Sequence, residues 1–341
     1  LNTDGSITKI KTRLVGCGYS QIEGRDFFDM YAHTLPGLCF RIFCSIIADE
    51  DLETDQIDAT KAFTQADIDT VLHAYMPDGF SIPGYVLLLL KALEGIRQGA
   101  ALWFKKNKWA WNKCGLFADL SEPNLYTHAT LKIIAAVFAD DVGVGFLHSC
   151  RTEYLALRGE YAKLIVIDSP GPDLVRPLSL FTGCELTRNR AARTIKVTQK
   201  AYALKLAARY KGLFTLNEMP FGASKAKREA FENLVPGEDE ATPTVKAEYL
   251  NRLGSIGWPT CMTKPQLQYT YGKLCGLTWS PPPGAMEATM HVVGYIVKSM
   301  DEGLVYGGKL RVPLGLSEMP PYFEESRGLY ASADSLSLIH I

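Results

Sequence analysis

The stretch from Leu131 to Phe146, LKIIAAVFADDVGVGF, carries the strongest structural signal in the chain. Two apolar, β-rich runs flank an Asp-Asp pair, a pattern typical of a hairpin whose strands are buried in a sheet. We expect Asp140 and Asp141 at the turn of this hairpin. Two adjacent carboxylates repel one another and resist ionisation, and a divalent cation removes that penalty. The stretch therefore predicts an antiparallel sheet with a metal-binding turn.

A second acidic segment supports this metal-site hypothesis. Asp58 lies in the strand-like segment QIDATKAF, residues 56–63. Mg²⁺ takes one or two protein carboxylates and completes its shell with water and substrate phosphates. Two strands that present three carboxylates therefore suffice for a site with two Mg²⁺ ions, for which Mn²⁺ is a substitute. An Asp-Asp pair alone is common, so the hypothesis depends on its setting between strands.

The rest of the chain alternates helix-like and strand-like patterns and predicts a mixed fold of helices and strands. Pro-Gly at 236–237 and a neighbouring acidic run make 222–244 the best candidate for a linker. Helices are expected at 40–51, 100–115, 199–211 and over most of 249–300, a hairpin at 181–198, and a basic hairpin arm at 6–18.

Composition excludes several classes of protein. The 341 residues suffice for two or three domains. The near balance of 36 Lys+Arg and 37 Asp+Glu excludes a protein that coats nucleic acid with a wholly basic surface, so any site for a polyanion is a local patch. Eight cysteines without a Cys-x-x-Cys pair indicate reduced thiols. Apolar runs such as 85–90 are far shorter than the ~20 residues of a spanning helix, so no membrane is expected as a partner. The start at Leu1, without a signal-peptide pattern, indicates a piece of a longer polypeptide.

Seven segments, in order along the chain, resemble the reverse transcriptases of Ty1/copia-type retrotransposons. Each match is weak alone, but all seven keep the family's order from residue 11 to residue 202. The segments are 11–27, 56–63, 76–80, 94–104, 138–141 (FADD, for the family's Y-V-D-D), 181–186 and 198–202.

The resemblance implies an α+β fold of the right-hand polymerase type, with fingers, an antiparallel palm sheet and a thumb, then a connection region and a truncated RNase H start. Ser332 replaces the first acidic residue of the RNase H motif, so no working RNase H is expected. The expected boundaries are 1–195 for fingers and palm, 196–245 for thumb and linker, 246–325 for the connection, and 326–341 for the RNase H start with an unmatched tail.

The resemblance also implies roles for individual residues. Phe63 would exclude a ribose 2′-hydroxyl, Arg13 would clamp the triphosphate, and Gly183 would belong to a primer grip. The catalytic residues would be Asp58, Asp140 and Asp141, which would bind metal together with the Ala59 carbonyl; the nucleotide would contact Lys11, Arg13, Phe63, Arg97, Gln98 and Ala139; primer and template would contact Phe138, Phe181, Gly183, Lys200, Lys205 and Arg209. Core packing for Phe63 and a solvated surface for the basic residues are the alternatives.

The implied function is template-directed DNA synthesis within a retrotransposon polyprotein. Its partners would be an RNA template, a DNA or RNA primer and deoxynucleoside triphosphates, and the family alone implies cytoplasmic particles and the nucleus as locations. Three departures fall near the chemistry: Glu94 and Phe138 each replace a Tyr, and Ala100 replaces a Pro. One alternative is a catalytically decayed remnant that binds nucleic acid nonspecifically. Another is a nucleotide cyclase, which also uses two metals but needs no basic arm or thumb.

Overall fold

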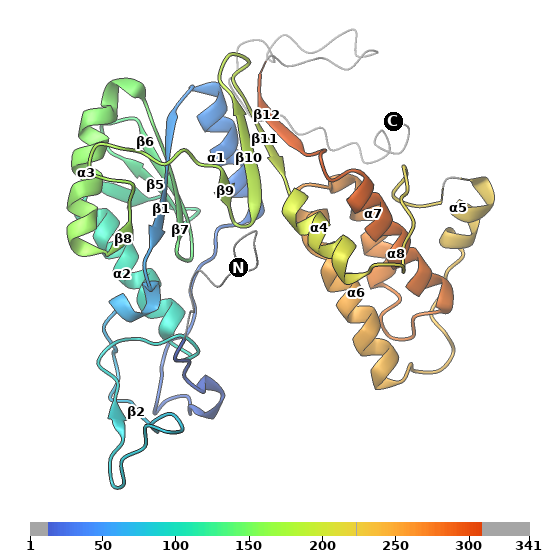
Figure 1. Cartoon of the computed structure of the whole chain (residues 1–341), viewed down its shortest axis with the longest axis horizontal. Coiled ribbons are helices and arrows are strands. Elements are labelled where there is room, and N and C mark those ends of the chain that lie inside the picture. Colours follow the sequence, from blue (N-terminus) through green and yellow to red (C-terminus); the bar gives the residue numbers. More distant parts are fainter. Residues whose placement is uncertain (1–12, 223, 309–341) are drawn as a thin grey trace, which may run out of the picture. The chain divides into compact units, whose positions relative to one another are not determined.

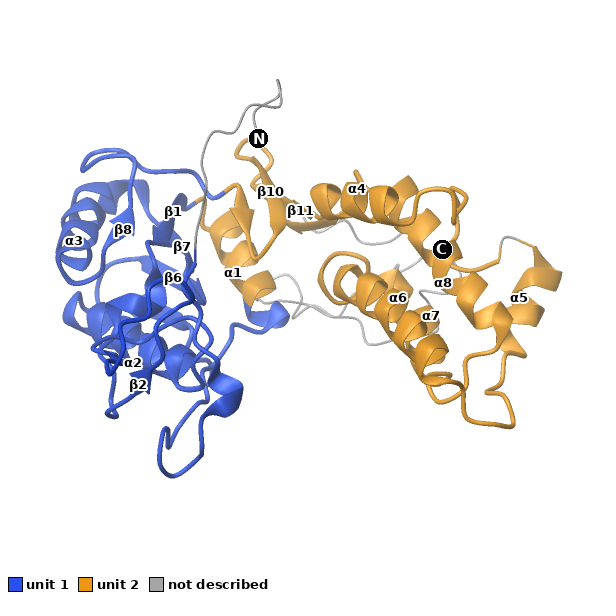
Figure 2. Ribbon diagram, turned by 60° about the horizontal axis from the view of Figure 1, so that its bottom comes forward, with its two compact units in different colours: residues 1–39, 52–178 blue, residues 40–51, 179–341 orange. Residues whose placement is uncertain are grey.

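A computed structural model describes residues 13–222 and 224–308 and shows helices combined with antiparallel sheets (Figure 1). The described residues form two compact units (Figure 2). Unit 1 contains the residues up to Cys39 together with 52–178, and unit 2 contains 40–51 together with the residues from Ser179 onward. The predicted α+β class with antiparallel sheets is confirmed. The expected boundaries at 195, 245 and 325 do not coincide with these units and stay predictions, and 326–341 lie outside the described residues.

Unit 1 is built on a six-stranded antiparallel sheet that contains the predicted hairpin. Strands β6 and β7 pair from Ile133 opposite Phe146 to Phe138 opposite Asp141. Asp141 is therefore the first residue of β7. The sheet order is β4 (Leu116–Ala118), β5 (Leu125–His128), β6 (Ile133–Phe138), β7 (Asp141–Phe146), β1 (Glu53–Ala59) and β8 (Ile167–Asp168).

Large aromatic side chains pack the helices of unit 1 against this sheet. Trp111 of α2 stacks on Tyr161 of α3 with ring centroids 4.1 Å apart, and Tyr154 of α3 stacks on Phe146 of β7 at 4.2 Å. Aromatic pairs bury large areas and fix the orientation of the elements that carry them. The other elements of unit 1 are α2 (Gly99–Lys113), α3 (Arg151–Leu164), the 3₁₀ turns η1 (Gly18–Ser20), η2 (Ala62–Gln65) and η3 (His148–Cys150), and the strand pair β2 (His73–Ala74) and β3 (Leu87–Leu88).

A buried ion pair links α3 to β1. Arg158 Nη1 lies 2.7 Å from Asp55 Oδ2, and both side chains are almost fully buried. Tyr154 also donates its hydroxyl proton to Asp55, and Arg158 donates to the carbonyl of Gly171. The backbone N–H of Arg176 donates to Asp55 Oδ1 at 2.7 Å. These bonds hold the connection that follows β8 against β1.

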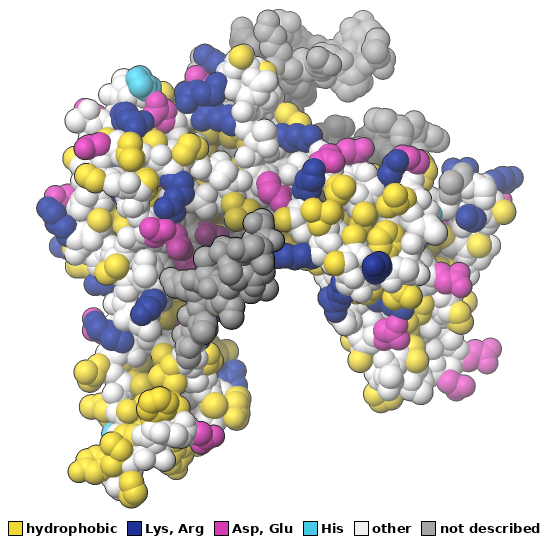
Figure 3. All heavy atoms as spheres, viewed as in Figure 1, with side chains coloured by type: hydrophobic (Ala, Val, Ile, Leu, Met, Phe, Trp, Pro, Cys, Tyr) yellow, Lys and Arg dark blue, Asp and Glu magenta, His cyan; other side chains and the backbone are white. Residues whose placement is uncertain are grey.

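The segment around β2 and β3 presents apolar side chains to solvent, where Figure 3 shows them gathered on unit 1. Five of them are at least 70% exposed: Val71, Tyr75, Phe80, Tyr85 and Leu90. Among the described residues, no helix has the length and apolar character needed to cross a membrane.

Unit 2 combines a four-stranded antiparallel sheet with a group of helices. Phe40 of α1 stacks on Phe181 of β9 at 5.4 Å, which attaches α1 to the sheet. The sheet order is β12 (Leu304–Gly307), β11 (Thr194–Thr198), β10 (Cys184–Asn189) and β9 (Leu180–Phe181). The helices are α1 (Gly37–Asp49), α4 (Lys200–Arg209), α5 (Lys225–Glu232), α6 (Pro243–Met262), the 3₁₀ turn η4 (Pro265–Leu267), α7 (Gln268–Cys275) and α8 (Pro283–Lys298).

The structure differs from two local expectations. The expected linker contains α5, whose first turn is capped by the Ser224 hydroxyl, which accepts from the N–H of Lys227. The described part of the basic arm, 13–18, forms no strand, because its backbone bonds elsewhere: the N–H of Gly16 donates to the Glu94 carbonyl at 2.7 Å and that of Gly18 to the Gly95 carbonyl at 3.1 Å. Residues 6–12 of the arm lie outside the described residues.

Candidate active site

The end of the β6–β7 hairpin brings the three predicted aspartates together. Asp58 of β1 lies directly opposite Asp141 of β7 in the antiparallel register. Directly opposite residues project from the same face of a sheet, so both carboxylates lie on one face. Asp140 occupies the adjoining turn, and its carbonyl accepts a hydrogen bond from the N–H of Ala59 at 3.2 Å. Asp58 and Asp140 are exposed and Asp141 is half-buried.

The turn between the two strands is held in place from α2. It consists of Ala139 and Asp140, and Ala139 adopts a left-handed φ of 55°. The buried side chain of Trp103 donates its Nε1 proton to the Ala139 carbonyl at 2.8 Å. The turn itself is exposed, but this hydrogen bond ties it to an indole in the core and so fixes its position. The position of Asp140 is therefore set by both α2 and β1.

The donor set at this edge fits Mg²⁺ in its chemistry. All three aspartates offer hard oxygen ligands, and Mg²⁺ needs only one or two protein carboxylates. Within 13–222 and 224–308, no three His, Cys, Asp or Glu side chains are gathered closely enough to hold an ion by themselves. A site here would draw its remaining ligands from water and phosphate. The metal-binding role of Asp58, Ala59, Asp140 and Asp141 stays a prediction.

A fourth carboxylate, missed by the sequence analysis, lies on the other side of Asp58. Strand β8 pairs with β1 so that Asp168 is directly opposite Asp58. Arg176 Nη2 lies 3.2 Å from Asp168 Oδ2 and offsets its charge. The available signal was the apolar run at 164–167, which Asp168 follows directly. The structure therefore places Asp58 between two acidic neighbours.

The predicted nucleotide-binding residues of unit 1 differ in how far they are available to a ligand. Arg13 is exposed, and its Nε lies 3.8 Å from Glu94 Oε2, so the departure at Glu94 is offset by a cation. Arg97 is exposed but its Nε donates to the Gly18 carbonyl at 3.0 Å. Phe63 is half-buried and packs against the core of unit 1. Lys11 lies outside the described residues.

Gln98 is fully buried and holds a neighbouring segment. Its Nε2 donates to the Asp26 carbonyl at 3.0 Å, and its Oε1 accepts from Gln21 Nε2 at 3.0 Å. Both ends of the amide are therefore engaged within the protein. The structure gives Gln98 an internal role, and its predicted contact with a nucleotide is untested.

The predicted primer-binding residues at 181–183 have internal packing roles in unit 2. Phe181 is fully buried against Phe40. Gly183 has a φ of +76°, and a Cβ there would lie 2.7 Å from Cη2 of Trp258. Only glycine meets both conditions without strain. The backbone of this turn, rather than its side chains, is what remains for contact with a primer.

The basic residues of α4 are partly engaged within unit 2. Lys200 Nζ lies 2.7 Å from Asp301 Oδ1, and Arg209 donates to Asn251 at 2.6 Å and to Ser255 at 3.3 Å. Lys205 is exposed and makes no hydrogen bond or ion pair with the rest of the described chain. Lys205 is therefore the member of this set best placed to bind an external phosphate.

Comparison with known proteins decides the family. The family model described as "Reverse transcriptase (RNA-dependent DNA polymerase)" matches residues 2–212, more than half of the chain. The chain belongs to the reverse transcriptase family. Membership implies, in general terms, the use of divalent metal ions and the binding of a template and primer.

Relatives of this reverse transcriptase domain are polyproteins of copia-type transposons. The chain is 23% identical over 313 residues to the retrovirus-related Pol polyprotein from transposon TNT 1-94 of Nicotiana tabacum, which covers 89% of this chain and 23% of the polyprotein. It is 24% identical to those from transposons RE2 and RE1 of Arabidopsis thaliana, again over 89% of this chain and 20% of each polyprotein. The chain thus spans less than a quarter of the length of these relatives.

Proposed function

We propose that this chain is an RNA-directed DNA polymerase that extends a primer by two-metal nucleotidyl transfer, on an RNA or a DNA template. The observation that carries the proposal is the register that places Asp58 opposite Asp141, with Asp140 in the adjoining turn. In this proposal the sheet of unit 1 is the palm of a right-hand polymerase and α4 belongs to the thumb. The family match to a reverse transcriptase supports the same reaction.

The carboxylates at this sheet edge would hold two Mg²⁺ ions through Asp58 and Asp140, with Asp141 and the Ala59 carbonyl in support. Bound Mg²⁺ supplies activation of the primer 3′-hydroxyl and neutralises charge on the triphosphate. Asp58 and Asp140 lie at the surface, where a primer end and a nucleotide can reach them. The turn held by Trp103 and Ala59 keeps Asp140 in place while the substrates change.

Selection and binding of the nucleotide would come from two residues of unit 1. The exposed guanidinium of Arg13 would bind the triphosphate, because it matches phosphate geometry bidentately. Phe63, anchored in the core on one side, would present its free edge to the sugar and exclude a 2′-hydroxyl. Template and primer would be held mainly through their phosphates, with Lys205, Lys200 and Arg209 contributing charge that salt screens.

Primer extension tests this function. The purified chain is incubated with an RNA template, an annealed DNA primer, four deoxynucleoside triphosphates and Mg²⁺ or Mn²⁺. We expect template-dependent extension with release of pyrophosphate, and little extension with ribonucleoside triphosphates. Nucleotide consumption without template and primer would instead indicate a cyclase.

A decayed polymerase is the alternative that Glu94 favours, because a carboxylate near a triphosphate weakens binding unless a cation offsets it. That alternative predicts no extension by a folded chain that still binds template and primer at low salt. Fluorescence anisotropy of a labelled template-primer, measured on the same sample, separates this result from a preparation that does not bind at all.

A further inference from the structure

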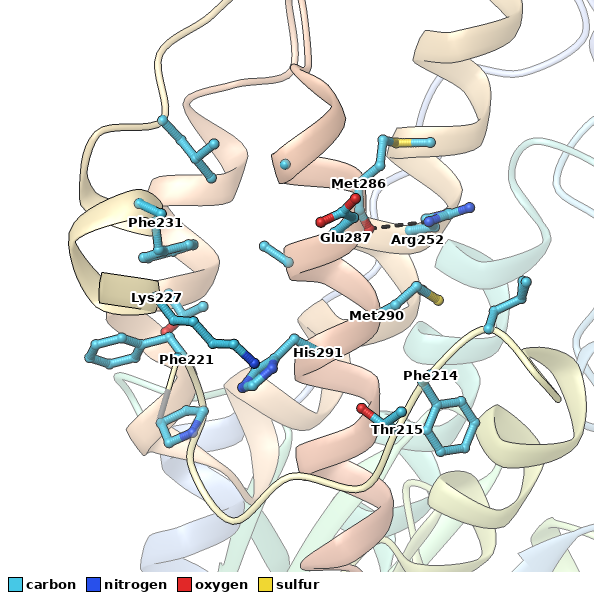
Figure 4. Close-up of a pocket in the computed structure, with 18 of the residues that line it drawn as sticks. Phe214, Thr215, Phe221, Lys227, Phe231, Arg252, Met286, Glu287, Met290 and His291 are labelled. Atoms are coloured by element: carbon cyan, nitrogen blue, oxygen red, sulfur yellow. Dashed lines mark hydrogen bonds between the residues drawn. The ribbon is translucent and has the colours of Figure 1, made fainter. Parts of the chain in front are cut away.

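Unit 2 contains a cavity that shares no residue with the proposed polymerase site. Its volume is about 590 Å³, within the range of small-molecule sites. The walls come from the loop 212–222 and from helices α5, α6, α7 and α8, and Figure 4 shows side chains from these elements around it. The cavity has no role in nucleotidyl transfer as proposed above.

Several contacts hold the loop that forms one wall against α8. Asn217 Nδ2 donates to the His291 carbonyl at 3.2 Å, and His291 Nε2 donates to the Met219 carbonyl at 3.0 Å. Gly294 allows the closest approach, since a Cβ there would lie 1.9 Å from the Thr215 carbonyl oxygen. The wall is therefore fixed by the protein itself, and a ligand would find the cavity already formed.

Aromatic and sulfur-containing side chains make up the bulkiest part of the cavity walls, beside smaller aliphatic residues and glycines. Phe214, Phe221 and Phe231 contribute rings, and Met286 and Met290 contribute thioethers, which adapt to the face of a flat ligand. Such walls favour a planar apolar body over a sugar or a peptide backbone, because those would bury polar groups without partners.

One end of the cavity carries a positive charge. Figure 4 shows the Lys227 side chain pointing toward His291. Burial lowers the pKa of His291, so its imidazole is neutral at pH 7 and leaves Lys227 as the charge at this end. Lys227 is exposed to solvent, and among the described residues its ammonium has no hydrogen-bond or ion-pair partner. An anionic group of a ligand would provide that partner.

A buried hydroxyl in the wall lacks a partner as well. Thr270 is 1% exposed, and its Oγ1 forms no hydrogen bond with any described residue. An unpaired buried hydroxyl is unfavourable, and a ligand with a polar atom removes this penalty on binding. This observation is independent of the charge on Lys227 and also indicates an occupant with a polar group.

The opposite end of the cavity is already neutralised. Arg252 donates to the Met286 carbonyl at 3.2 Å and also pairs with Glu248. Figure 4 shows Glu287 on the Arg252 side, away from Lys227. The negative charge of Glu287 therefore does not compete for Lys227, and one charged group on the ligand is enough.

From these observations we infer that unit 2 binds a small, flat aromatic molecule with a single anionic group. Its ring system lies between the phenylalanine and methionine side chains, and its anion pairs with Lys227. The inference does not depend on polymerase activity, since every contact comes from the cavity walls.

Two dyes that differ by one charge test this inference. Anilinonaphthalene sulfonate carries the anion, and N-phenyl-1-naphthylamine has the same rings without it. We expect one sulfonate molecule to bind per chain with a dissociation constant on the order of micromolar, measured by fluorescence titration. Lys227→Met is expected to weaken binding of the sulfonate at least fivefold and to change the affinity for the uncharged dye by less than twofold. Lys225→Met, two residues away on α5 and outside the cavity, changes neither.

Blocking variants show whether the dyes occupy this cavity. Ala288→Trp on α8 and Ala230→Trp on α5 place a large ring in the cavity from different walls. Each is expected to weaken binding of both dyes at least tenfold. Ala208→Trp, on the exposed surface of α4, is the matched control. Circular dichroism and thermal unfolding establish that each variant folds. Saturable binding that neither folded blocking variant weakens would overturn the inference, as would a sulfonate affinity unchanged by Lys227→Met.

Discussion

Asp58 on β1 lies directly opposite Asp141 on β7, although the two residues are 83 positions apart in the sequence. This register places two carboxylates on one face of the sheet, and Asp140 follows in the turn that the Ala59 N–H and Trp103 hold. The arrangement concentrates negative charge at a surface edge, which is the condition under which a divalent cation binds.

Asp168 extends this charge, and its removal is expected to weaken metal binding. Because Asp168 is opposite Asp58, Asp168→Asn removes one negative charge from the metal's surroundings and leaves Arg176 without its partner. We predict a roughly three- to tenfold rise in the Mg²⁺ concentration for half-maximal primer extension, with the rate at saturating Mg²⁺ little changed. Asp173→Asn, in the exposed part of the same connection, is the control. Equal Mg²⁺ requirements for the two variants would exclude a role for Asp168.

Glu94 is expected to weaken nucleotide binding through Arg13. Their side chains form an exposed ion pair at 3.8 Å, so the guanidinium is partly neutralised before a triphosphate arrives. Glu94→Gln should therefore lower the KM for deoxynucleoside triphosphates by roughly two- to fivefold, since exposed pairs contribute up to about 1 kcal/mol. Asp67→Asn breaks the exposed pair with Lys91 and should leave KM unchanged. A KM that does not fall in Glu94→Gln would show that Arg13 does not contact the triphosphate.

The pair of Asp55 and Arg158 is expected to contribute strongly to the stability of unit 1. Asp55→Ala leaves a buried guanidinium without its counter-ion, and we predict that the free energy of unfolding falls by about 3–5 kcal/mol. Glu160→Ala removes an exposed partner of Lys163 on the same helix and should cost less than about 1 kcal/mol. Urea denaturation followed by tryptophan fluorescence measures both. Similar losses in the two variants would contradict the structural role of the buried pair.

Lys264 in unit 2 gives a pH dependence with a definite sign. The side chain is 4% exposed, its Nζ donates to the carbonyls of Ser299 and Glu302, and burial lowers its pKa to about 8. Below pH 8 both the folded and the unfolded chain hold the proton, so the cost of burying the charge is present in full. Between about pH 8 and the ordinary value of 10.5, the unfolded chain binds more protons, so stability rises with pH.

The comparison with Lys264→Met isolates this effect. From pH 7.5 to pH 10, the free energy of unfolding of the wild type should gain ~2 kcal/mol relative to the variant. Burial raises the pKa of the Cys44 and Cys184 thiols, so these thiols lower stability at high pH equally in the wild type and the variant, and their contributions cancel in the difference. A difference that stays constant over this range would show that Lys264 keeps an ordinary pKa in the folded chain.

The elements that the sequence predicted well are those set by local patterns. The β6–β7 hairpin follows from two apolar runs around one turn, and α1, α2 and α4 follow from helical periodicity and propensity. Helix α5 was missed because its sequence KAKREAFE is mostly charged and Phe231 is its buried residue. Ser224 as an N-cap is a local signal for this helix, whereas the packing of the Phe231 ring in unit 2 is nonlocal.

The sequence singles out the three aspartates of the candidate site but not the way they are arranged. Asp58, Asp140 and Asp141 follow from motif resemblance, whereas the position of Asp168 beside Asp58 depends on a two-residue strand whose partner is distant in sequence. The same limit applies to Gln98: its spacing resembles a nucleotide-binding motif, yet its amide is buried between two segments that meet only in the fold. Nonlocal pairing decides both cases.

Single-nucleotide incorporation by aspartate variants tests the central claim most directly. Rates are measured for the wild type, Asp58→Asn, Asp140→Asn and the control Asp78→Asn, an exposed aspartate in another turn. The proposed site predicts that Asp58→Asn and Asp140→Asn each lower the rate by roughly 10³-fold or more, because each removes a ligand that positions a catalytic metal, while template-primer binding stays within twofold. The control should match the wild type. Incorporation that persists in folded Asp58→Asn and Asp140→Asn proteins would contradict the assignment of this sheet edge as the catalytic centre.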